Sequence, residues 1–403
     1  MQKQKSAVPI IFAAGWITYL TAYLCRVNFS SAMNTITLEK GYDAGLLGII
    51  GAVYYGMYAF GQLVNGYIGD RVRANRFMLL ALFGTMICNL IMSFSGSFAL
   101  MLVIWGINGC FQSMFWSTII RVLAQNISAD KRASVSAGIS IAMPIAYMVS
   151  WGVLGKCLEG ASAMWYFFVP ALICLPVIGI WLYLSKKLSF EIPGKGENKH
   201  TIKETLEFIG KERLILIVIV CMLHGLIKEG AAYWTPLLIS GMDVSKTLSP
   251  YVLVSILPSA NLVGILLSRS LLKSIKKAPY VILVMLFISI GCVSVGLSVS
   301  SAGLVIIGMM ALISGLCYAN NTILMSFIPM QYTEKNMVAS IIGVFDFASY
   351  VGAAVSTYVL GRVLSSVGFA PLPFIWVFAS AAACAIGYTA YKMRKKDASQ
   401  VHA

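Results

Sequence analysis

The chain has 403 residues, of which 59% are hydrophobic and only 11% are charged. Soluble domains carry about a quarter charged residues, so this composition excludes an ordinary soluble protein. The formal net charge is +15. Its distribution along the chain decides whether that charge indicates a nucleic-acid partner or membrane topology.

Apolar runs of about twenty residues recur along the chain, each long enough to cross a hydrocarbon core of about 30 Å as a helix. A backbone in lipid must satisfy its own hydrogen bonds, and the runs lack the alternation of a β-barrel. The sequence therefore predicts an all-α integral membrane fold with twelve transmembrane helices. The predicted spans are residues 7–34, 44–68, 77–95, 98–125, 133–155, 163–185, 214–240, 248–268, 279–298, 301–328, 336–361 and 372–391.

Basic residues lie mainly in alternate connections between these spans. The connections on the side of both termini hold most of them, among them Arg71, Arg73, Arg76, Lys276, Lys277 and the segment 186–213. The opposite connections hold only Lys40, Lys156, Lys246 and Arg362. This is the positive-inside pattern, so both termini are predicted to be cytoplasmic, in a multi-pass protein of the inner membrane. The positive charge then indicates topology and contact with the lipid bilayer, not nucleic acid.

One long polar segment divides the spans into six and six. It contains Pro193 and Gly194, which break helices. The sequence therefore predicts an N-terminal six-helix half at residues 1–185, a cytoplasmic linker at 186–213 and a C-terminal six-helix half at 214–403. A repeat supports two pseudo-symmetric halves, because Gly66-x3-Asp70-Arg71 ends span two and Gly264-x3-Ser268-Arg269 ends span eight. Two halves rocking about a central site is the expected mechanical design.

Cysteine and histidine show no pattern of metal binding. The nine cysteines are scattered singly without C-x-x-C spacing, and His200, His224 and His402 form no ligand cluster in the sequence. No metal site and no cofactor is therefore predicted. No nucleophile motif or phosphate-cradling glycine loop is present either, so an enzyme is not expected.

Two cations lie deep in the predicted spans. Arg26 falls in span one, and Lys228 is about fifteen residues into span seven. A charge at the bilayer centre costs about 2.5–3.5 kcal/mol even on lenient scales, so such residues usually face a cavity and have a role. Spans one and seven are equivalent in the two halves. One cation from each half would bind a small anionic substrate, and we expect both residues to do so.

Three further charges lie within spans, and their roles stay open. Glu229 follows Lys228, so it is expected to point about 100° away around the helix, where it pairs elsewhere or carries a proton. Asp346 in span eleven either neutralises Lys228 or titrates during transport. Arg121, near the cytoplasmic end of span four, snorkels, braces helices or contacts substrate.

Aromatic and amide side chains within the spans supply hydrogen-bond donors that suit a phosphate or a carboxylate. Each alone is more often a packing residue. The candidates for substrate contact in this set are Tyr55, Gln112, Trp116, Asn320 and Tyr350, with Tyr54, Tyr147, Trp234 and Asn321 beside them.

Several stretches of the chain are similar to the organophosphate:phosphate antiporter family of the major facilitator superfamily. This family contains glycerol-3-phosphate and hexose-6-phosphate antiporters. The similarity runs through nearly the whole chain and is carried by YLCRVNFSSAM, GMYAFGQLVNGYIGDRVRANR, WGINGCFQSMFWSTIIR, KEGAAYWTP and GVFDFASYVGAAVS.

The resemblance implies roles for particular residues. In the family an arginine of span one and a basic residue of span seven hold the substrate phosphate, and these positions match Arg26 and Lys228. A tyrosine one turn before the arginine matches Tyr23, which the resemblance makes a phosphate donor. Asp70 and Arg71 match the superfamily's cytoplasmic gating motif. Family members usually act as monomers, so a monomer is expected.

The chain also departs from the family pattern. Val27, Gln62 and Met143 stand where the resemblance expects basic residues or histidine, and Phe347 replaces a tyrosine for which Tyr350, one turn later, is a substitute. Fewer cations and two extra carboxylates argue against glycerol-3-phosphate itself. They fit a monoanion, an amino-bearing substrate or proton coupling.

The sequence therefore predicts a secondary transporter of a small organic anion by alternating access, exchanging a phosphorylated metabolite for inorganic phosphate. Two alternatives stay open. Residues 26–30, Arg-Val-Asn-Phe-Ser, also resemble proton-coupled symporters of hexuronates and related carboxylates. The family further includes a non-transporting sensor of sugar phosphate.

Overall fold

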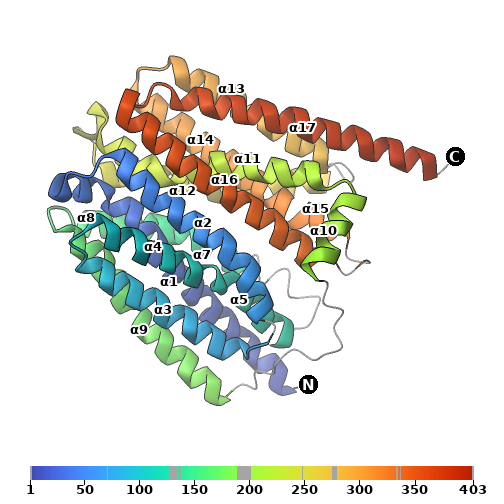
Figure 1. Cartoon of the computed structure of the whole chain (residues 1–403), viewed down its shortest axis with the longest axis horizontal. Coiled ribbons are helices and arrows are strands. Elements are labelled where there is room, and N and C mark those ends of the chain that lie inside the picture. The colour runs from blue at the N-terminus through green and yellow to red at the C-terminus, as the bar shows by residue number, and fades with distance from the viewer. Residues whose placement is uncertain are drawn as a thin grey trace. The chain divides into compact units, whose positions relative to one another are not determined.

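The computed structural model describes most of the chain. The described residues are 2–69, 71–126, 135, 138–187, 201–246, 248–274, 279–332, 335 and 337–401. All regular secondary structure within these residues is helical (Figure 1). The predicted hinge residues Pro193 and Gly194, and Asp70 of the predicted gating motif, lie outside the described part of the chain.

The helices up to residue 187 are α1 (Gln2–Lys40), α2 (Ala44–Gly69), α3 (Ala74–Ser93), α4 (Phe98–Gln112), α5 (Met114–Asn126), α7 (Ala142–Tyr147), a π-helical segment η1 (Met148–Leu154), α8 (Gly155–Cys157) and α9 (Ala163–Lys187). Those that follow are α10 (Ile202–Lys211), α11 (Ile215–Ser240), a 3₁₀ turn η2 (Asp243–Lys246), α12 (Pro250–Ser274), α13 (Pro279–Val299), α14 (Gly303–Thr322), the π-helical η3 (Ile323–Phe327), α15 (Ile328–Met330), α16 (Val338–Val367) and α17 (Leu372–Val401).

Twelve helical stretches of the described chain are long and apolar enough to cross a membrane, which confirms the predicted number. They are Pro9–Lys40, Ala44–Asn65, Ala74–Ser93, Phe98–Leu123, Gly138–Cys157, Ala163–Lys187, Ile215–Ser240, Pro250–Ser268, Pro279–Val299, Gly303–Met330, Ser340–Val367 and Leu372–Met393. The first extends beyond the predicted 7–34. Its polar end, residues 35–40, continues the same helix, because helical backbone needs no apolar side chains once it leaves the hydrocarbon.

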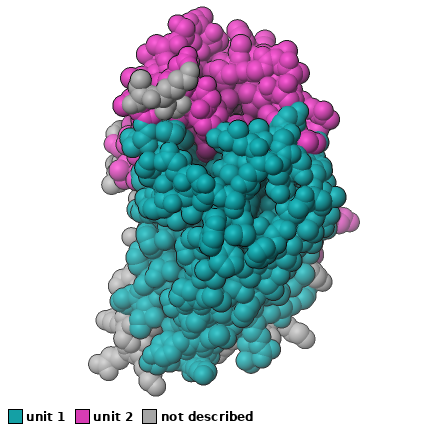
Figure 2. Space-filling view, turned by 90° about the vertical axis from the view of Figure 1, so that its left-hand side faces the viewer, with its two compact units in different colours: residues 1–43, 49–197, 249–255 teal, residues 44–48, 198–248, 256–403 magenta. Residues whose placement is uncertain are grey.

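The chain forms two compact units, coloured separately in Figure 2. Unit 1 consists of Met1–Asp43, Ile49–Glu197 and Ser249–Ser255, and unit 2 of Ala44–Gly48, Asn198–Leu248 and Ile256–Ala403. Helices α2 and α12 each contribute residues to both units.

A buried polar layer joins α1, α3, α4 and α9 inside unit 1. Asn28 donates to the Asn89 carboxamide at 2.7 Å and to the Tyr166 carbonyl at 3.0 Å. Asn89 and Asn108 both donate to the Cys25 carbonyl, at 3.3 and 3.2 Å. Amide groups without partners in a dry core would cost about 1–3 kcal/mol each. These hydrogen bonds therefore fix the register of α1, the helix that carries Arg26.

Glycines allow α11 and α16 to pack backbone against backbone inside unit 2. A Cβ added at Gly225 would lie 1.9 Å from the Ser349 carbonyl oxygen, and one added at Gly352 would lie 1.9 Å from the Met222 carbonyl oxygen. Small residues give membrane helices this close approach, where van der Waals contact replaces the hydrophobic effect. The contact holds Lys228, on α11, at a fixed height along α16.

Replacing Gly225 with alanine should lower the free energy of unfolding by about 3 kcal/mol or more, because the new methyl group has no room without separating the two backbones. Gly308 of α14 is the matched control, since an added Cβ there meets nothing within 4 Å. Gly308→Ala should be neutral or stabilising by up to about 1 kcal/mol through helix propensity. Thermal unfolding of the two purified variants in detergent measures both effects. Equal midpoints would contradict the role of the Gly225 contact.

Candidate functional site

Arg26 lies within a ring of tyrosines in unit 1. Its side chain is buried, with 6% of the residue exposed. The guanidinium carbon is 5.1 Å from the centre of the Tyr23 ring, 5.9 Å from Tyr54, 5.4 Å from Tyr55 and 5.2 Å from Tyr58. We call these four residues the tyrosine cage. Aromatic faces attract a guanidinium by about 0.5–2 kcal/mol each, so the cage stabilises a positive charge within the span.

Helix geometry explains the cage. Tyr23 and Arg26 are three residues apart on α1, and Tyr54 and Tyr58 are four apart on α2, so each pair shares one helix face. Tyr55 completes the cage from α2 and packs edge-to-face on Tyr54 at 5.2 Å between ring centres. The structure therefore brings together three predicted site residues, Arg26, Tyr23 and Tyr55.

The aromatic surface continues away from the cage. Tyr19 contacts both Tyr23 and Trp116 at 5.0 Å between ring centres, and Tyr23 is 6.0 Å from Tyr147. Trp116, a predicted site residue, thus reaches the cage through Tyr19. Tyr19 was absent from the predicted site, although its position four residues before Tyr23 on α1 marks the same helix face.

Gln112 lies in the buried polar layer. Its amide nitrogen is 3.5 Å from the Thr85 hydroxyl on α3, and the side chain is 3% exposed. This contact directs the amide toward a helix interface within unit 1. A role for Gln112 in substrate contact remains a prediction.

Lys228 of unit 2 contacts Glu229, Asn321 and Tyr318. Its ammonium lies 2.9 Å from the Glu229 carboxylate, 3.3 Å from the Asn321 side-chain oxygen and 5.6 Å from the centre of the Tyr318 ring. The Lys228 and Glu229 side chains are only 10% and 5% exposed. We call these four residues the lysine cluster, which combines α11 and α14.

The pairing of Lys228 with Glu229 differs from the expectation that adjacent residues point apart. Their Cα–Cβ directions do diverge by about 100°. The long methylene stem of lysine nevertheless lets the ammonium reach back to the neighbouring carboxylate. An ion pair of adjacent residues is therefore compatible with helical geometry when both stems are long.

Asp346, Tyr350 and Asn320 occupy other positions of unit 2. Asp346 is half-buried on α16. Tyr350 is buried one turn further along α16. Asn320 precedes Asn321 on α14 and is fully buried, and its amide has no hydrogen-bond partner among the described residues. Substrate or ion-pair roles for these three remain predictions.

His224 is a polar residue near the lysine cluster that sequence reasoning missed. It lies one turn before Lys228 on α11 and is fully buried. Neither ring nitrogen has the geometry of a hydrogen bond to a described residue. The spacing of four residues from Lys228 was the available signal, because residues at i and i+4 share a helix face.

The comparison with known proteins decides the family. The sequence profile of the Major Facilitator Superfamily matches residues 15–357. The chain belongs to this superfamily. It is a secondary transporter of that type, with multiple membrane spans, and the predicted fold class is confirmed.

Relatives within the superfamily are named for phosphorylated substrates. The chain is 25% identical over 396 residues to a probable hexose phosphate transport protein of Chlamydia trachomatis, covering 89% of this chain and 85% of the relative. It is 35% identical over 103 residues to the hexose-6-phosphate:phosphate antiporter of Escherichia coli, covering 24% and 22%. These names confirm the resemblance to the organophosphate:phosphate antiporter family.

Solved structures of the superfamily share the fold. The nucleoside transporter NupG has a TM-score of 0.74 and 14% sequence identity, covering 96% of this chain and 99% of that protein. At this identity the likeness shows the fold alone.

Arg121 of this superfamily member joins helices of unit 1. Its guanidinium donates to the Val72 carbonyl at 3.4 Å and to the Thr118 hydroxyl at 3.2 Å, and it lies 5.2 Å from the centre of the Phe77 ring. These contacts fit a brace between α5 and the start of α3. Arg71, of the predicted gating motif, is exposed, and its backbone N–H donates to the Ile68 carbonyl at the end of α2.

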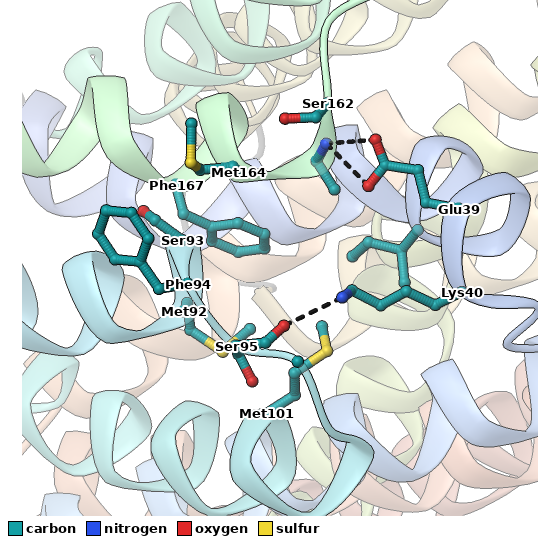
Figure 3. Close-up of a pocket in the computed structure, with 13 residues that line it drawn as sticks. Glu39, Lys40, Met92, Ser93, Phe94, Ser95, Met101, Ser162, Met164 and Phe167 are labelled. Carbon is teal, nitrogen blue, oxygen red and sulfur yellow. Dashed lines mark hydrogen bonds between the residues drawn. The ribbon is translucent and has the colours of Figure 1, made fainter.

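A cavity of about 240 Å³ lies in unit 1 where α1 ends and α9 begins (Figure 3). The Glu39 carboxylate accepts hydrogen bonds from the Ala163 backbone N–H at 3.1 and 3.2 Å, and the Lys40 ammonium donates to the Ser95 carbonyl at 3.0 Å. A carboxylate at the first turn of α9 satisfies an orphan helix donor and favours the helix dipole. The cavity shares no lining residue with the tyrosine cage.

Proposed function

We propose that this superfamily member exchanges a phosphorylated metabolite for inorganic phosphate by alternating access. The proposal is supported by two cations within the spans, Arg26, which is buried on the first span, and Lys228, whose side chain is 10% exposed on the seventh. The names of the curated relatives support a phosphorylated substrate.

The two cations differ in what they offer a phosphate. The Arg26 guanidinium presents parallel N–H donors, and the hydroxyls of the tyrosine cage can donate as well. Lys228 presents a point charge with three donors, and its ammonium already contacts the Glu229 carboxylate and the Asn321 side-chain oxygen. A guanidinium can therefore orient a phosphoryl group, whereas an ammonium contributes mainly charge.

Exchange of labelled inorganic phosphate tests the proposal. The purified protein is reconstituted into liposomes loaded with unlabelled phosphate, and labelled phosphate is added outside. We expect rapid entry of label that external hexose 6-phosphate or another sugar phosphate inhibits. Absence of exchange by folded protein would contradict the proposal.

A proton-coupled symporter of a carboxylate or sugar acid is the second candidate, favoured by the buried Glu229 carboxylate beside Lys228. Uptake of labelled hexuronate driven by a proton gradient would support it. Hexuronate uptake that does not depend on the proton gradient, or the absence of hexuronate uptake, would argue against the symporter and favour the antiporter.

The protein is proposed to lie in the inner membrane with both termini in the cytoplasm. Its two halves, residues 1–185 and 214–403, are joined by a cytoplasmic linker at 186–213. Cys157, at the end of the fifth span, then faces outside. It is exposed. A membrane-impermeant maleimide added to intact cells should therefore label the wild-type protein.

Cys157→Ser is the control for this prediction and should remove the label. Cys110 and Cys174 lie within spans and should not react from the aqueous side. Labelling that needs opened membranes would reverse the proposed orientation.

A further inference from the structure

Lys228, the proposed substrate ligand of unit 2, forms an ion pair with the adjacent Glu229. The ammonium of Lys228 and the carboxylate of Glu229 are 2.9 Å apart, both nearly buried, and both on α11. Because the two residues are adjacent on one helix, they move together through any rocking of the halves. The pair is therefore expected to persist when no substrate is bound.

A buried cation affects whether a transporter without substrate can change between its inward-facing and outward-facing states. An ammonium without a counter-ion is unfavourable in a low-dielectric interior, so the occluded empty state is raised in free energy. A carrier with such a bare cation returns only when another anion neutralises it, which enforces strict exchange. A carrier whose cation has a built-in carboxylate does not meet this barrier.

We propose that Glu229 is the resident counter-ion of Lys228 and lets the empty carrier return, so that this protein catalyses net anion uptake as well as exchange. The proposal rests on the proposed function, since it takes Lys228 as an anion ligand. The arriving phosphoryl group displaces the carboxylate from the ammonium.

In unit 1, aromatic rings stabilise the charge of Arg26. The guanidinium of Arg26 lies within 5.1–5.9 Å of four tyrosine ring centres. Cation–π attraction is stronger where the groups are desolvated. The tyrosine cage therefore lowers the free energy of the buried guanidinium when no anion is bound, which also favours return of the empty carrier.

Two liposome assays on the full-length protein separate net uptake from exchange. In the first, liposomes contain unlabelled phosphate and labelled phosphate enters by exchange. In the second, the lumen contains no phosphate, and valinomycin with equal potassium on both sides holds the membrane potential at zero. We expect the wild-type protein to take up label in both assays.

Glu229→Gln removes the carboxylate charge and keeps the side-chain size. Exchange should continue with an altered KM for phosphate, because the competing anion is gone. The ratio of net uptake to exchange should fall at least about ten-fold, since the ammonium of the empty carrier has lost its adjacent carboxylate. Glu229→Asp keeps the charge and should restore most of the ratio.

Glu212→Gln is the matched control. Glu212 also pairs with a lysine of unit 2, Lys335, but this lysine is half-exposed. Its removal should leave the ratio unchanged. Glu229→Gln leaves one charge of a nearly buried ion pair, so its thermal midpoint should be lower than that of the wild type. Size-exclusion profiles and thermal unfolding in detergent confirm that each variant is folded at the assay temperature.

The outcomes separate the two proposals. Wild-type exchange without net uptake would overturn the resident counter-ion and leave the antiporter intact. An unchanged ratio in folded Glu229→Gln, or equal loss of both activities in Glu229→Gln and Glu229→Asp, would also overturn it. No exchange by folded wild-type protein would remove the proposed function and this proposal with it.

Discussion

Replacing Arg26 with alanine should reduce phosphate exchange by about a hundred-fold or more. A hydrogen bond to a charged group contributes about 1.5–3 kcal/mol, and a bidentate guanidinium makes two of them to one phosphoryl group. Arg26→Lys should recover only part of the activity, because an ammonium cannot form two parallel hydrogen bonds or stack its plane on the tyrosine cage. The initial rate of labelled phosphate exchange in liposomes measures both variants.

Arg362 provides the matched control for this substitution. It also lies over a tyrosine, 5.8 Å from the centre of the Tyr358 ring, but its side chain is exposed. Arg362→Ala should therefore leave the exchange rate within about two-fold, since exposed cation–π contacts contribute only about 0.5–1 kcal/mol. Equal losses in the two variants would mean that Arg26 supports the fold and not the substrate.

The arrangement around Arg26 could be predicted in part. Length and hydropathy predict twelve spans, and the depth of Arg26 in an apolar run marks it as functional. Tyr23 and Tyr55 were named as candidates. The contacts of Tyr54 and Tyr58 with the guanidinium depend on how α2 packs against α1, which one sequence does not specify. Helix faces can be read from spacing, whereas the partner of each face depends on tertiary packing.

The lysine cluster shows a second limit of sequence reasoning. A helical wheel gives the direction of each Cβ atom. It does not give the position of the ammonium at the end of a lysine side chain. It therefore directed Glu229 away from Lys228, and the structure pairs them at 2.9 Å. Similarly, nothing in the sequence near Gly225 indicates that the Ser349 carbonyl oxygen lies 1.9 Å from the position that a Cβ at residue 225 would occupy. Such contacts depend on the distance between two helices, which requires coordinates.

Substitutions at Lys228 and Glu229 should separate the effect of the ion pair on protein stability from its effect on phosphate exchange. Lys228→Met alone leaves the Glu229 carboxylate buried without the ammonium that now neutralises it. Breaking a buried ion pair from one side destabilises proteins by about 3–5 kcal/mol. We therefore expect Lys228→Met to unfold at a markedly lower temperature than the wild type and to exchange phosphate at least about a hundred-fold more slowly.

The double variant Lys228→Met/Glu229→Gln removes both charges. Replacing a buried ion pair by hydrophobic side chains of similar volume is often neutral or stabilising. Glutamine is polar but carries no charge, so the thermal midpoint should rise above that of Lys228→Met and toward that of the wild type. Exchange should stay as low as in Lys228→Met, because the anion ligand is still missing. Recovery of exchange together with stability would mean that Lys228 holds α11 in place and does not bind the anion. Recovery of stability alone would assign Lys228 to the substrate and Glu229 to its neutralisation.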